Sequence, residues 1–358
     1  MIAASLANDR WLLNPKFRTH KKHRVMEIVL NTFGTSLNRD NECFVVSNDQ
    51  GRQRVPPESV SSITLCRGVS ITSDAVLLAI SHGIEIRFVD RRGMPQGLVW
   101  SHRYGSISTI RKGQLEFTAS PAAVEWIKGV IVKKLENQQA LLLMLGSDSP
   151  GVRAAADHAI AHIEALRLKA EALAGDRVAD VAGMLRGIEG AASRAYFAAF
   201  NAALPAAYRF AERSQHPAAD VANALLNYGY GILYGRVEAS LIKSGIDPYI
   251  GVMHRDDYNR PVLVYDVIEL YRVWVDYVVA ALLCQNAVTD DYYSTAPDGS
   301  CWLEGLGRRV LIQSVNDYLA ELTVTDGGMS RSRATAIDLY AQQLAQRFKA
   351  AAGGTPKK

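Results

Sequence analysis

The stretch SPAAVEWIKGVIVKKLENQQALLLML, residues 120–145, marks a change in the pattern of the chain. From Val124 to Leu145 its apolar residues recur at intervals of three and four, which is typical of a helix with one buried face. Ser120 and Pro121 come before them, and a serine followed by proline fits the capping position and the first turn of a helix. The sequence therefore predicts a helical domain that begins here.

The same helical spacing continues almost to the end of the chain. The predicted helices cover residues 124–145, 151–174, 178–202, 220–244, 265–285, 302–322 and 330–351. We expect them to form a helical bundle over residues 120–350. Residues 351–358 contain two glycines and a proline, and we expect a flexible tail there.

Upstream of residue 104 the pattern is different. Short runs rich in valine, isoleucine, phenylalanine and threonine are separated by turn-forming residues such as NDQG at 48–51. The predicted strands cover residues 27–32, 42–47, 60–65, 84–89 and 98–101, and a short helix covers 74–81. Short strands at this spacing favour a sandwich or barrel over strand–helix–strand units.

The predicted fold class is therefore α+β, with two domains. An N-terminal β-sandwich domain at residues 26–103 is followed by a linker at 104–119 and by the larger, all-α helical domain. The length of 358 residues is consistent with two domains.

The positive charge of the chain is concentrated at its start. Lysine and arginine exceed aspartate and glutamate by four over the whole sequence, 40 against 36. Residues 1–25 hold six basic residues and one aspartate, so the other 333 residues sum to −1. Residues 1–25 are thus a basic leader that we expect to be flexible, and net charge alone does not indicate that the folded body binds nucleic acid.

Membrane and disulfide classes are disfavoured by the same composition. The longest apolar run, Val278 to Cys284, is seven residues, whereas a membrane helix needs about 20. None of the four cysteines lies in a C-x-x-C pair, so free thiols are expected. We expect a cytoplasmic protein that does not enter a membrane.

One segment interrupts the helical domain. Residues 244–261 read SGIDPYIGVMHRDDYNRP, and their glycines and prolines prevent a continuous helix. His254 lies in this insert, between an apolar pair and a charged run. Because long irregular inserts in a bundle tend to carry function, His254 is a candidate site residue.

Acidic residues with apolar neighbours suggest a partner for His254. Asp266 and Glu269 are three residues apart, so a helix would place them on one face, and Glu189 lies alone among glycine, alanine and isoleucine. Carboxylates at the edge of a core need a cation, either a metal ion or an arginine. Glu189, His254 and Glu269, with Asp266, could form a mixed oxygen and nitrogen site, in which the carboxylates suit Mg²⁺ and Mn²⁺ and one imidazole is compatible with Mn²⁺.

Each of these residues has a simpler interpretation that spacing alone leaves open. Asp266 and Glu269 could pair with Arg272, Glu189 with Arg186 or Arg194, and His254 could be an ordinary loop or capping histidine. The pair His158 and His162, four residues apart, favours a solvated helix face.

The longest specific match of the sequence is to a known family. The segments GIDPYIGVMH at 245–254 and RPVLVYDVIELYRVWVD at 260–276 closely resemble the signature of the CRISPR adaptation integrase, a metal-dependent DNA endonuclease that inserts new spacers. The segment around Glu189 resembles the first acidic motif of that family. The resemblance covers about residues 26–350. Residues 1–25 fall outside it, and Met26 is the expected natural start, with the leader as an upstream start or a fusion junction.

The resemblance implies an N-terminal β-sandwich for dimerisation and a helical catalytic domain. It implies a homodimer that binds splayed or branched DNA at a CRISPR repeat, usually with a small second adaptation subunit of ferredoxin-like fold. Carried onto this chain, the metal ligands are Glu189, His254 and Glu269, with Asp266 as a further catalytic acid. Glu269 departs from the pattern, because some members have aspartate there.

The implied reaction is a transesterification in which the 3′-hydroxyl of a DNA fragment attacks a phosphodiester of the repeat. The bound Mg²⁺ or Mn²⁺ would activate this nucleophile, and water in its place would give endonuclease activity. Arg255, Arg260 and Arg272 flank the insert and are the candidates for phosphate contact. This hypothesis requires that no lysine or arginine of the chain fills the space between the metal ligands.

Two other functions stay open. The first is a non-catalytic DNA-binding scaffold of the adaptation complex, in which the acids serve the structure. The second, a di-metal oxidase in a helical bundle, expects Glu-x-x-His pairs, and the sequence has none.

Overall fold

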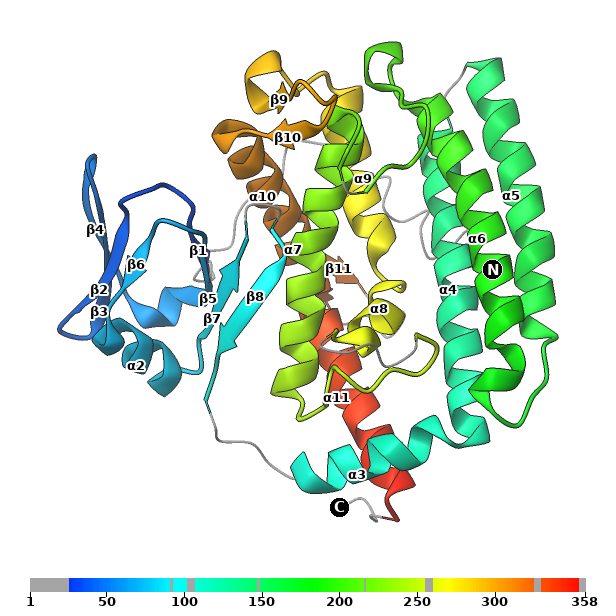
Figure 1. Ribbon diagram of the computed structural model, residues 1–358, viewed down its shortest axis with the longest axis horizontal. Coiled ribbons are helices and arrows are strands. Elements are labelled where there is room, and N and C mark those ends of the chain that lie inside the picture. Colours follow the sequence, from blue (N-terminus) through cyan, green and yellow to red (C-terminus); the bar gives the residue numbers. More distant parts are fainter. Residues whose placement is uncertain are drawn as a thin grey trace. The chain divides into compact units, whose positions relative to one another are not determined.

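The computed structural model describes residues 26–90, 93–101, 107–146, 149–215, 217–254, 260–324 and 330–353. The basic leader and Arg255 lie outside these residues. The chain divides into two compact units, Met1–Arg103 with Asp326–Met329 and Tyr104–Thr325 with Ser330–Lys358. The mixed α+β class is confirmed, since one unit is rich in strands and the other is mainly helical (Figure 1).

The N-terminal unit contains two four-stranded sheets. One sheet has the order β1-β5-β7-β8 and the other the order β4-β3-β2-β6. The strands are β1 (Met26–Leu30), β2 (Ser36–Asp40), β3 (Cys43–Asn48), β4 (Gly51–Val55), β5 (Val60–Leu65), β6 (Ser70–Ile71), β7 (Glu85–Val89) and β8 (Pro95–Val99). Apolar residues of both sheets, among them Ile28, Phe44 and Ile63, form one buried core.

The expectation of no strand–helix–strand unit is wrong. Strands β5 and β7 are parallel, and the chain between them includes helix α2 (Ser73–Ser81). The Thr72 side chain caps α2 by accepting from the Ala75 backbone N–H, and Leu78 of α2 is buried in the core. Strands β2 and β4 were not predicted because they are polar along most of their length, with Leu37 and Val55 as their buried residues.

The larger unit is a set of helices. They are α3 (Ile107–Thr118), α4 (Pro121–Leu145), α5 (Pro150–Glu171), α6 (Val178–Ala203), α7 (Val221–Lys243), α8 (Val262–Ile268), α9 (Arg272–Cys284), α10 (Gly305–Ala320) and α11 (Arg333–Ala351). Two short hairpins, β9 (Tyr293–Thr295) with β10 (Cys301–Leu303) and β11 (Leu322–Val324) with β12 (Ser330–Ser332), complete it.

Helix α3 occupies most of the segment expected to be a linker. It buries Ile110, Gly113, Gln114 and Phe117, which recur at helical spacing, and it packs against α11. The polar residues between these four positions weaken the apolar pattern, which is why the sequence does not identify the helix. Helix α3 also contributes to the site described below, through Gln114.

Helix α4 lies at the centre of the larger unit. It packs against α5 and α6 and also against α8 and α9 (Figure 1). Helix α7 packs against α8 and α9, and at Gly229 the backbone of α7 comes so close to α9 that a Cβ would lie 2.5 Å from Val275. The side chains of α4, α6, α8 and α9 can therefore meet in the middle of the bundle.

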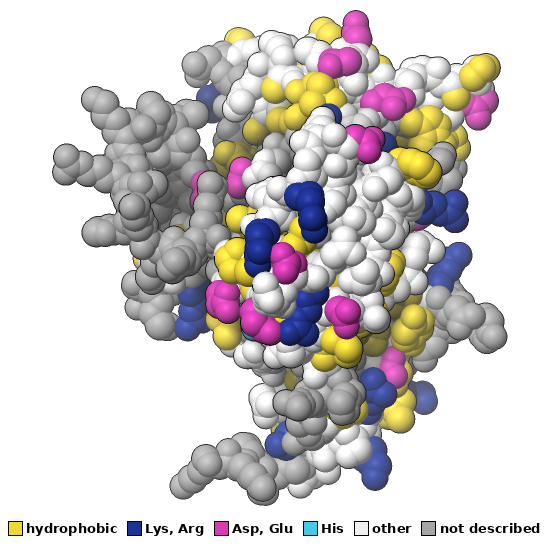
Figure 2. All heavy atoms as spheres, turned by 90° about the vertical axis from the view of Figure 1, so that its left-hand side faces the viewer, with side chains coloured by type: hydrophobic (Ala, Val, Ile, Leu, Met, Phe, Trp, Pro, Cys, Tyr) yellow, Lys and Arg dark blue, Asp and Glu magenta, His cyan; other side chains and the backbone are white. Residues whose placement is uncertain are grey.

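Within the described residues, none of the helices is long and apolar enough to cross a membrane. On the face drawn in Figure 2, Lys and Arg side chains lie among Asp and Glu side chains. Ion pairs on the sheet β4-β3-β2-β6 show the same mixing, with Arg39 beside Glu42 and Arg54 beside Asp40.

Candidate active site

The centre of the bundle holds two carboxylates with a lysine between them. The Lys134 Nζ of α4 lies 2.6 Å from Glu189 Oε1 of α6 and 2.6 Å from Glu269 Oε2 at the C-terminal end of α8. Lys134 and Glu269 are buried, with 6% and 4% of their surfaces exposed. The bundle thus brings together Glu189 and Glu269, which are 80 residues apart in the sequence.

Glu269 contacts a second cation. Its Oε1 accepts a hydrogen bond of 2.6 Å from the Arg272 Nε. Burial opposes the charge of Glu269, but Arg272 and Lys134 outweigh it and hold the pKa of this carboxyl below its usual range. The Glu269 Oε2 is the oxygen that forms the close ion pair with Lys134, so both oxygens of this buried carboxylate face a cation.

A helix break places Glu269 where it is. The sequence predicts one helix over residues 265–285, but the structure has α8 and α9 with Glu269 to Tyr271 between them. Asp266 and Glu269 have different partners, and Glu269 is the C-terminal capping residue of α8. No glycine or proline occurs at the break, so the sequence carries no signal for it.

Asp266 is the anchor of the loop that carries His254. Its carboxylate is fully buried and accepts hydrogen bonds from the backbone N–H groups of Val252 (2.8 Å), Met253 (3.1 Å) and His254 (3.2 Å). The His254 Nδ1 lies 2.7 Å from Asp266 Oδ1. Since a carboxylate only accepts, Nδ1 is the donor, and in the neutral ring Nε2 keeps its lone pair for another ligand.

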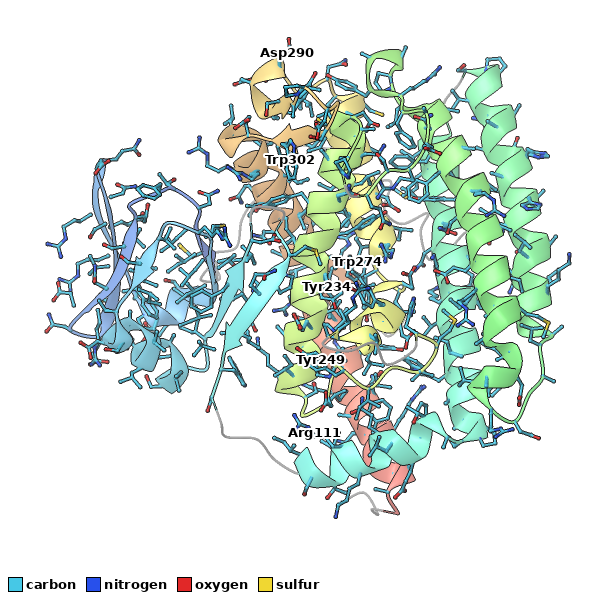
Figure 3. The ribbon with its side chains drawn as sticks, in the orientation of Figure 1. Arg111, Tyr234, Tyr249, Trp274, Asp290 and Trp302 are labelled. Carbon is cyan, nitrogen blue, oxygen red and sulfur yellow. The ribbon has the colours of Figure 1, made fainter. Side chains whose placement is uncertain are left out.

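The charge around His254 connects it to the two glutamates. Burial alone would lower the pKa of His254, but the hydrogen bond with Asp266 and the charges of Asp266, Glu189 and Glu269 together raise it. The ring packs 5.7 Å from Tyr265, measured between centroids, and Tyr265 packs against Tyr234 of α7. Figure 3 labels Tyr234 and, on α9, Trp274, which packs against Tyr271 at the helix break.

Gln114 of α3 holds the start of the same loop. Its Nε2 donates to the carbonyl oxygens of Asp247 (2.7 Å) and Ile250 (3.1 Å), and its Oε1 accepts from the Asp247 N–H (3.0 Å). At Gly251 a Cβ would lie 2.5 Å from the His254 carbonyl oxygen, so the loop turns tightly there. Gln114, Gly251 and Asp266 therefore determine the path of the loop up to His254.

A cavity of about 570 Å³ opens beside the two glutamates. Its lining includes Lys134, Glu189 and Glu269, and the buried Gln138 Oε1, which has no hydrogen-bond partner among the described residues. Its other walls carry arginines and aromatic side chains, together with two further acids: Arg194, Arg213, Arg272, Phe197, Phe210, Tyr230, Glu212 and Asp276. The arginines and the rings suit a ligand with anionic groups and flat rings.

One wall of the cavity contains a further buried acid. Asp276 of α9 accepts hydrogen bonds from the hydroxyls of Tyr196 (2.7 Å) and Tyr230. Burial raises the pKa of Asp276 to about 6 despite these bonds and the charges of Arg213 and Arg272. Arg272 lies over the Tyr230 ring, 4.9 Å from its centroid, so this network adjoins the partner of Glu269.

The predicted site residues are thus found in two adjoining groups. Glu189 and Glu269 meet at Lys134, whereas His254 is hydrogen-bonded to Asp266. Within the described residues, no three His, Cys, Asp or Glu side chains lie close enough together to bind a metal ion. Arg260 is exposed, and Arg272 is the ion-pair partner of Glu269. For Glu269 the pairing with Arg272 is confirmed, and for Glu189 the cation is Lys134 in place of Arg186 or Arg194.

Lys134 and Gln138 are the residues that the sequence interpretation omits. A signal for them exists, because they fall on the buried stripe of α4 together with Ile127, Val130 and Ile131. Polar side chains on such a stripe require buried partners. The sequence does not show what those partners are.

The donor set nevertheless fits a divalent cation in its chemistry. Two carboxylates and an imidazole whose Nε2 keeps its lone pair are suitable ligands, and the Gln138 Oε1 is a buried acceptor without a hydrogen-bond partner among the described residues. The position between the carboxylates is the one that the Lys134 ammonium takes, so the requirement that no lysine or arginine of the chain fill this space is not met. A cation would therefore have to share or replace the contacts of Lys134.

Comparison with known proteins is consistent with this description. The sequence profile of the family described as CRISPR associated protein Cas1 matches residues 28–317. A CRISPR-associated endonuclease Cas1 from Pyrobaculum aerophilum is 35% identical over 267 residues, which are 72% of this chain and 82% of that protein. One from Archaeoglobus fulgidus is 29% identical over 311 residues, 83% of this chain and 89% of that protein.

Solved structures share the fold. A Cas1 protein from Thermotoga maritima matches with a TM-score of 0.73 and 20% identity, over 90% of this chain and 97% of that one. A casposase bound to integration product matches with a TM-score of 0.77 and 19% identity, over 90% of both chains. A chain of a Cas6-RT-Cas1–Cas2 complex matches with a TM-score of 0.73 and 23% identity; the match spans 93% of this chain and 36% of that longer one. From the family profile and the relatives together, this chain belongs to the Cas1 family of CRISPR-associated proteins.

Proposed function

We propose that this protein is a divalent-metal-dependent DNA endonuclease and integrase that inserts short DNA fragments into a CRISPR array. The observation that carries the proposal is the pair Glu189 and Glu269 beside a cavity with arginine and aromatic walls, with the Asp266-anchored His254 in the adjoining group, in a Cas1 family member. The relatives named as endonucleases and the casposase bound to an integration product support this reaction class.

Glu189, His254 and Glu269 are the residues that would hold Mg²⁺ or Mn²⁺, the carboxylates through oxygen and the imidazole through Nε2. Such a cation supplies Lewis-acid activation of a hydroxyl or water and charge stabilisation at the phosphodiester. Asp266 keeps the imidazole in one tautomer and one orientation. Arg272 orients Glu269, and the exposed Arg194 of the cavity is the proposed phosphate contact, since Arg213 already donates to Ser214, Asn223 and Asn227.

DNA with splayed or branched ends is the proposed substrate, since single-stranded nucleotides suit a cavity that offers both arginine and aromatic walls. The proposed partners are a second copy of this chain and a small second adaptation subunit of ferredoxin-like fold. The complexes that contain Cas1 together with Cas2 support the second of these. We also propose that the N-terminal unit is a β-sandwich through which two copies of the chain dimerise.

A second function, that of a non-catalytic DNA-binding scaffold, is favoured by one observation. Lys134 already neutralises Glu189 and Glu269, as expected if these acids serve only the packing of α4 against α6 and α8. The two functions differ in whether a branched DNA substrate is cut or joined in the presence of a metal ion.

The test is the variant His254→Ala in the full chain, assayed for strand transfer and cleavage of branched DNA with Mn²⁺. We expect both activities to be lost while the thermal unfolding temperature changes little, because the ring is only partly buried. His158→Ala, an exposed histidine on α5, is the matched control and should keep full activity. Full activity in His254→Ala would exclude the proposed site, and no activity in the unmodified protein would favour the scaffold.

A further inference from the structure

Lys134 makes the same two contacts that a metal ion at this site would need. Its ammonium lies 2.6 Å from one oxygen of Glu189 and 2.6 Å from one oxygen of Glu269. These carboxylates come from different helical elements, so the lysine holds α6 and the end of α8 to α4. Its ammonium is thus the cation that bridges the two acids in this structure.

The two glutamates of the site are already paired with cations of the chain. Glu189, Glu269 and Asp266 face the charges of Lys134 and Arg272, with His254 next to them. The Lys134 ammonium is buried and lies against both carboxylates, which are its ion-pair partners. A divalent cation between the same carboxylates would be repelled by an ammonium that kept its place.

We infer that Lys134 and the divalent cation compete for Glu189 and Glu269, so that Lys134 sets the metal affinity of the site. This inference rests on the proposed function. Metal binding replaces the two ion pairs of Lys134 and turns its side chain away from the carboxylates. The lysine already lines the cavity of about 570 Å³, which offers space for the displaced ammonium.

In the protein without metal, Lys134 keeps both glutamates paired with a cation. With the lysine removed and no metal bound, Glu189 and Glu269 would face one another with Arg272 as their remaining close cation. Uncompensated buried charge is strongly unfavourable. Removing the lysine should therefore weaken the metal-free protein and strengthen metal binding at the same time, a combination that a purely structural lysine would not produce.

The experiment measures binding of Mn²⁺ alone to the full chain, by calorimetry and by the EPR signal of free Mn²⁺, without DNA. Lys134→Met should bind Mn²⁺ at least tenfold more tightly than the unmodified protein. Lys134→Arg, which keeps the charge and presents a planar guanidinium that can pair with both carboxylates, should bind it several-fold more weakly. Lys133→Met is the matched control, because that side chain is 57% exposed and pairs with Glu136, and its affinity should equal that of the unmodified protein.

Thermal unfolding gives a second readout. Without metal, Lys134→Met should unfold at a lower temperature than the unmodified protein. Saturating Mn²⁺ should raise the unfolding temperature of Lys134→Met by more than it raises that of the unmodified protein. Should Lys134→Met not fold without metal, Lys134→Arg carries the test: weaker Mn²⁺ binding supports the competition, and unchanged binding overturns it.

The outcomes separate this inference from the proposed function. Equal or weaker Mn²⁺ binding by a folded Lys134→Met, with clear binding by the unmodified protein, overturns the competition and leaves the metal site standing. Absence of Mn²⁺ binding at millimolar concentration in both proteins overturns the metal site itself. Binding that is seen in Lys134→Met and not in the unmodified protein supports both.

Discussion

His254 is fixed by Asp266 through two different bonds, one to its backbone and one to its ring. Asp266 Oδ1 accepts from the His254 N–H at 3.2 Å and from its Nδ1 at 2.7 Å. The other oxygen of Asp266 accepts from the two preceding N–H groups. One buried carboxylate therefore determines both the path of the loop and the direction in which the imidazole points.

Asp266→Asn should loosen the loop and the ring together. An amide replaces one acceptor oxygen by a donor, which then faces N–H groups. We expect the free energy of unfolding to fall by about 3 kcal/mol, the cost of unpaired buried donors. Strand transfer should fall by about 10- to 100-fold, as is typical for residues that orient a metal-binding histidine. Urea denaturation and the strand-transfer assay measure the two effects, and a variant with unchanged stability and rate would contradict the role of Asp266.

The sequence predicts the elements of the helical domain better than it predicts their contacts. Helices α4 to α7 are found within a few residues of their expected bounds, because their apolar residues repeat over many turns. The break after α8 and helix α3 are not expected, because both depend on packing that is remote in the sequence. The resemblance to the family indicates Glu189, His254 and Glu269, whereas Lys134 and Gln114 become visible only when α4 and α3 are placed beside them.

Gln114→Leu tests whether α3 positions the loop of His254. The leucine fills similar space but leaves three backbone groups of residues 247 and 250 without their partner. We expect a loss of about 2–4 kcal/mol of stability and faster hydrogen exchange at the N–H groups of Val252 to His254. Gln343→Leu, an exposed position on α11, should change neither. If exchange in this segment stays slow in Gln114→Leu, Asp266 alone holds the loop.

Gly251→Ala should disturb the site without changing its chemistry. The new Cβ would lie 2.5 Å from the His254 carbonyl oxygen and 2.8 Å from Val262 Cγ2, so the loop must shift. We expect strand transfer to fall at least tenfold. Gly187→Ala on α6 is the control, since no atom lies within 4 Å of its added Cβ, and it should stabilise the helix by about 0.5–1 kcal/mol. Equal activity in the two variants would show that the position of His254 is not critical.

Arg194 is the exposed arginine among those that line the cavity, and we expect it to contact a phosphate of the DNA. Arg194→Ala should weaken binding of splayed DNA and reduce the slope of log affinity against log salt by about one, the loss of one phosphate contact. The effect should not depend on the DNA sequence. Arg111→Ala, an exposed position on α3 that is not part of the cavity lining, is the control (Figure 3). An unchanged salt slope in Arg194→Ala would place the phosphates elsewhere.

Asp276 should make the stability of the protein depend on pH between about 4 and 6. Burial raises its pKa from 3.8 to about 6 in the folded protein, so folding favours the protonated carboxyl. The stabilisation from this proton is complete below the unfolded pKa and is lost as the pH rises through about 6. A shift of about two units corresponds to about 3 kcal/mol.

Asp276→Asn removes this dependence because an amide does not ionise, and it can still accept from one tyrosine hydroxyl and donate to the other. The free energies of unfolding of the variant and of the unmodified protein are measured in urea at pH 4.5 and pH 7.5. Between these two pH values the stability of the variant relative to the unmodified protein should rise by up to about 3 kcal/mol. Asp157→Asn, exposed on α5, should show no such change. A difference that is constant with pH would mean that Tyr196 and Tyr230 hold the Asp276 carboxylate ionised in spite of its burial.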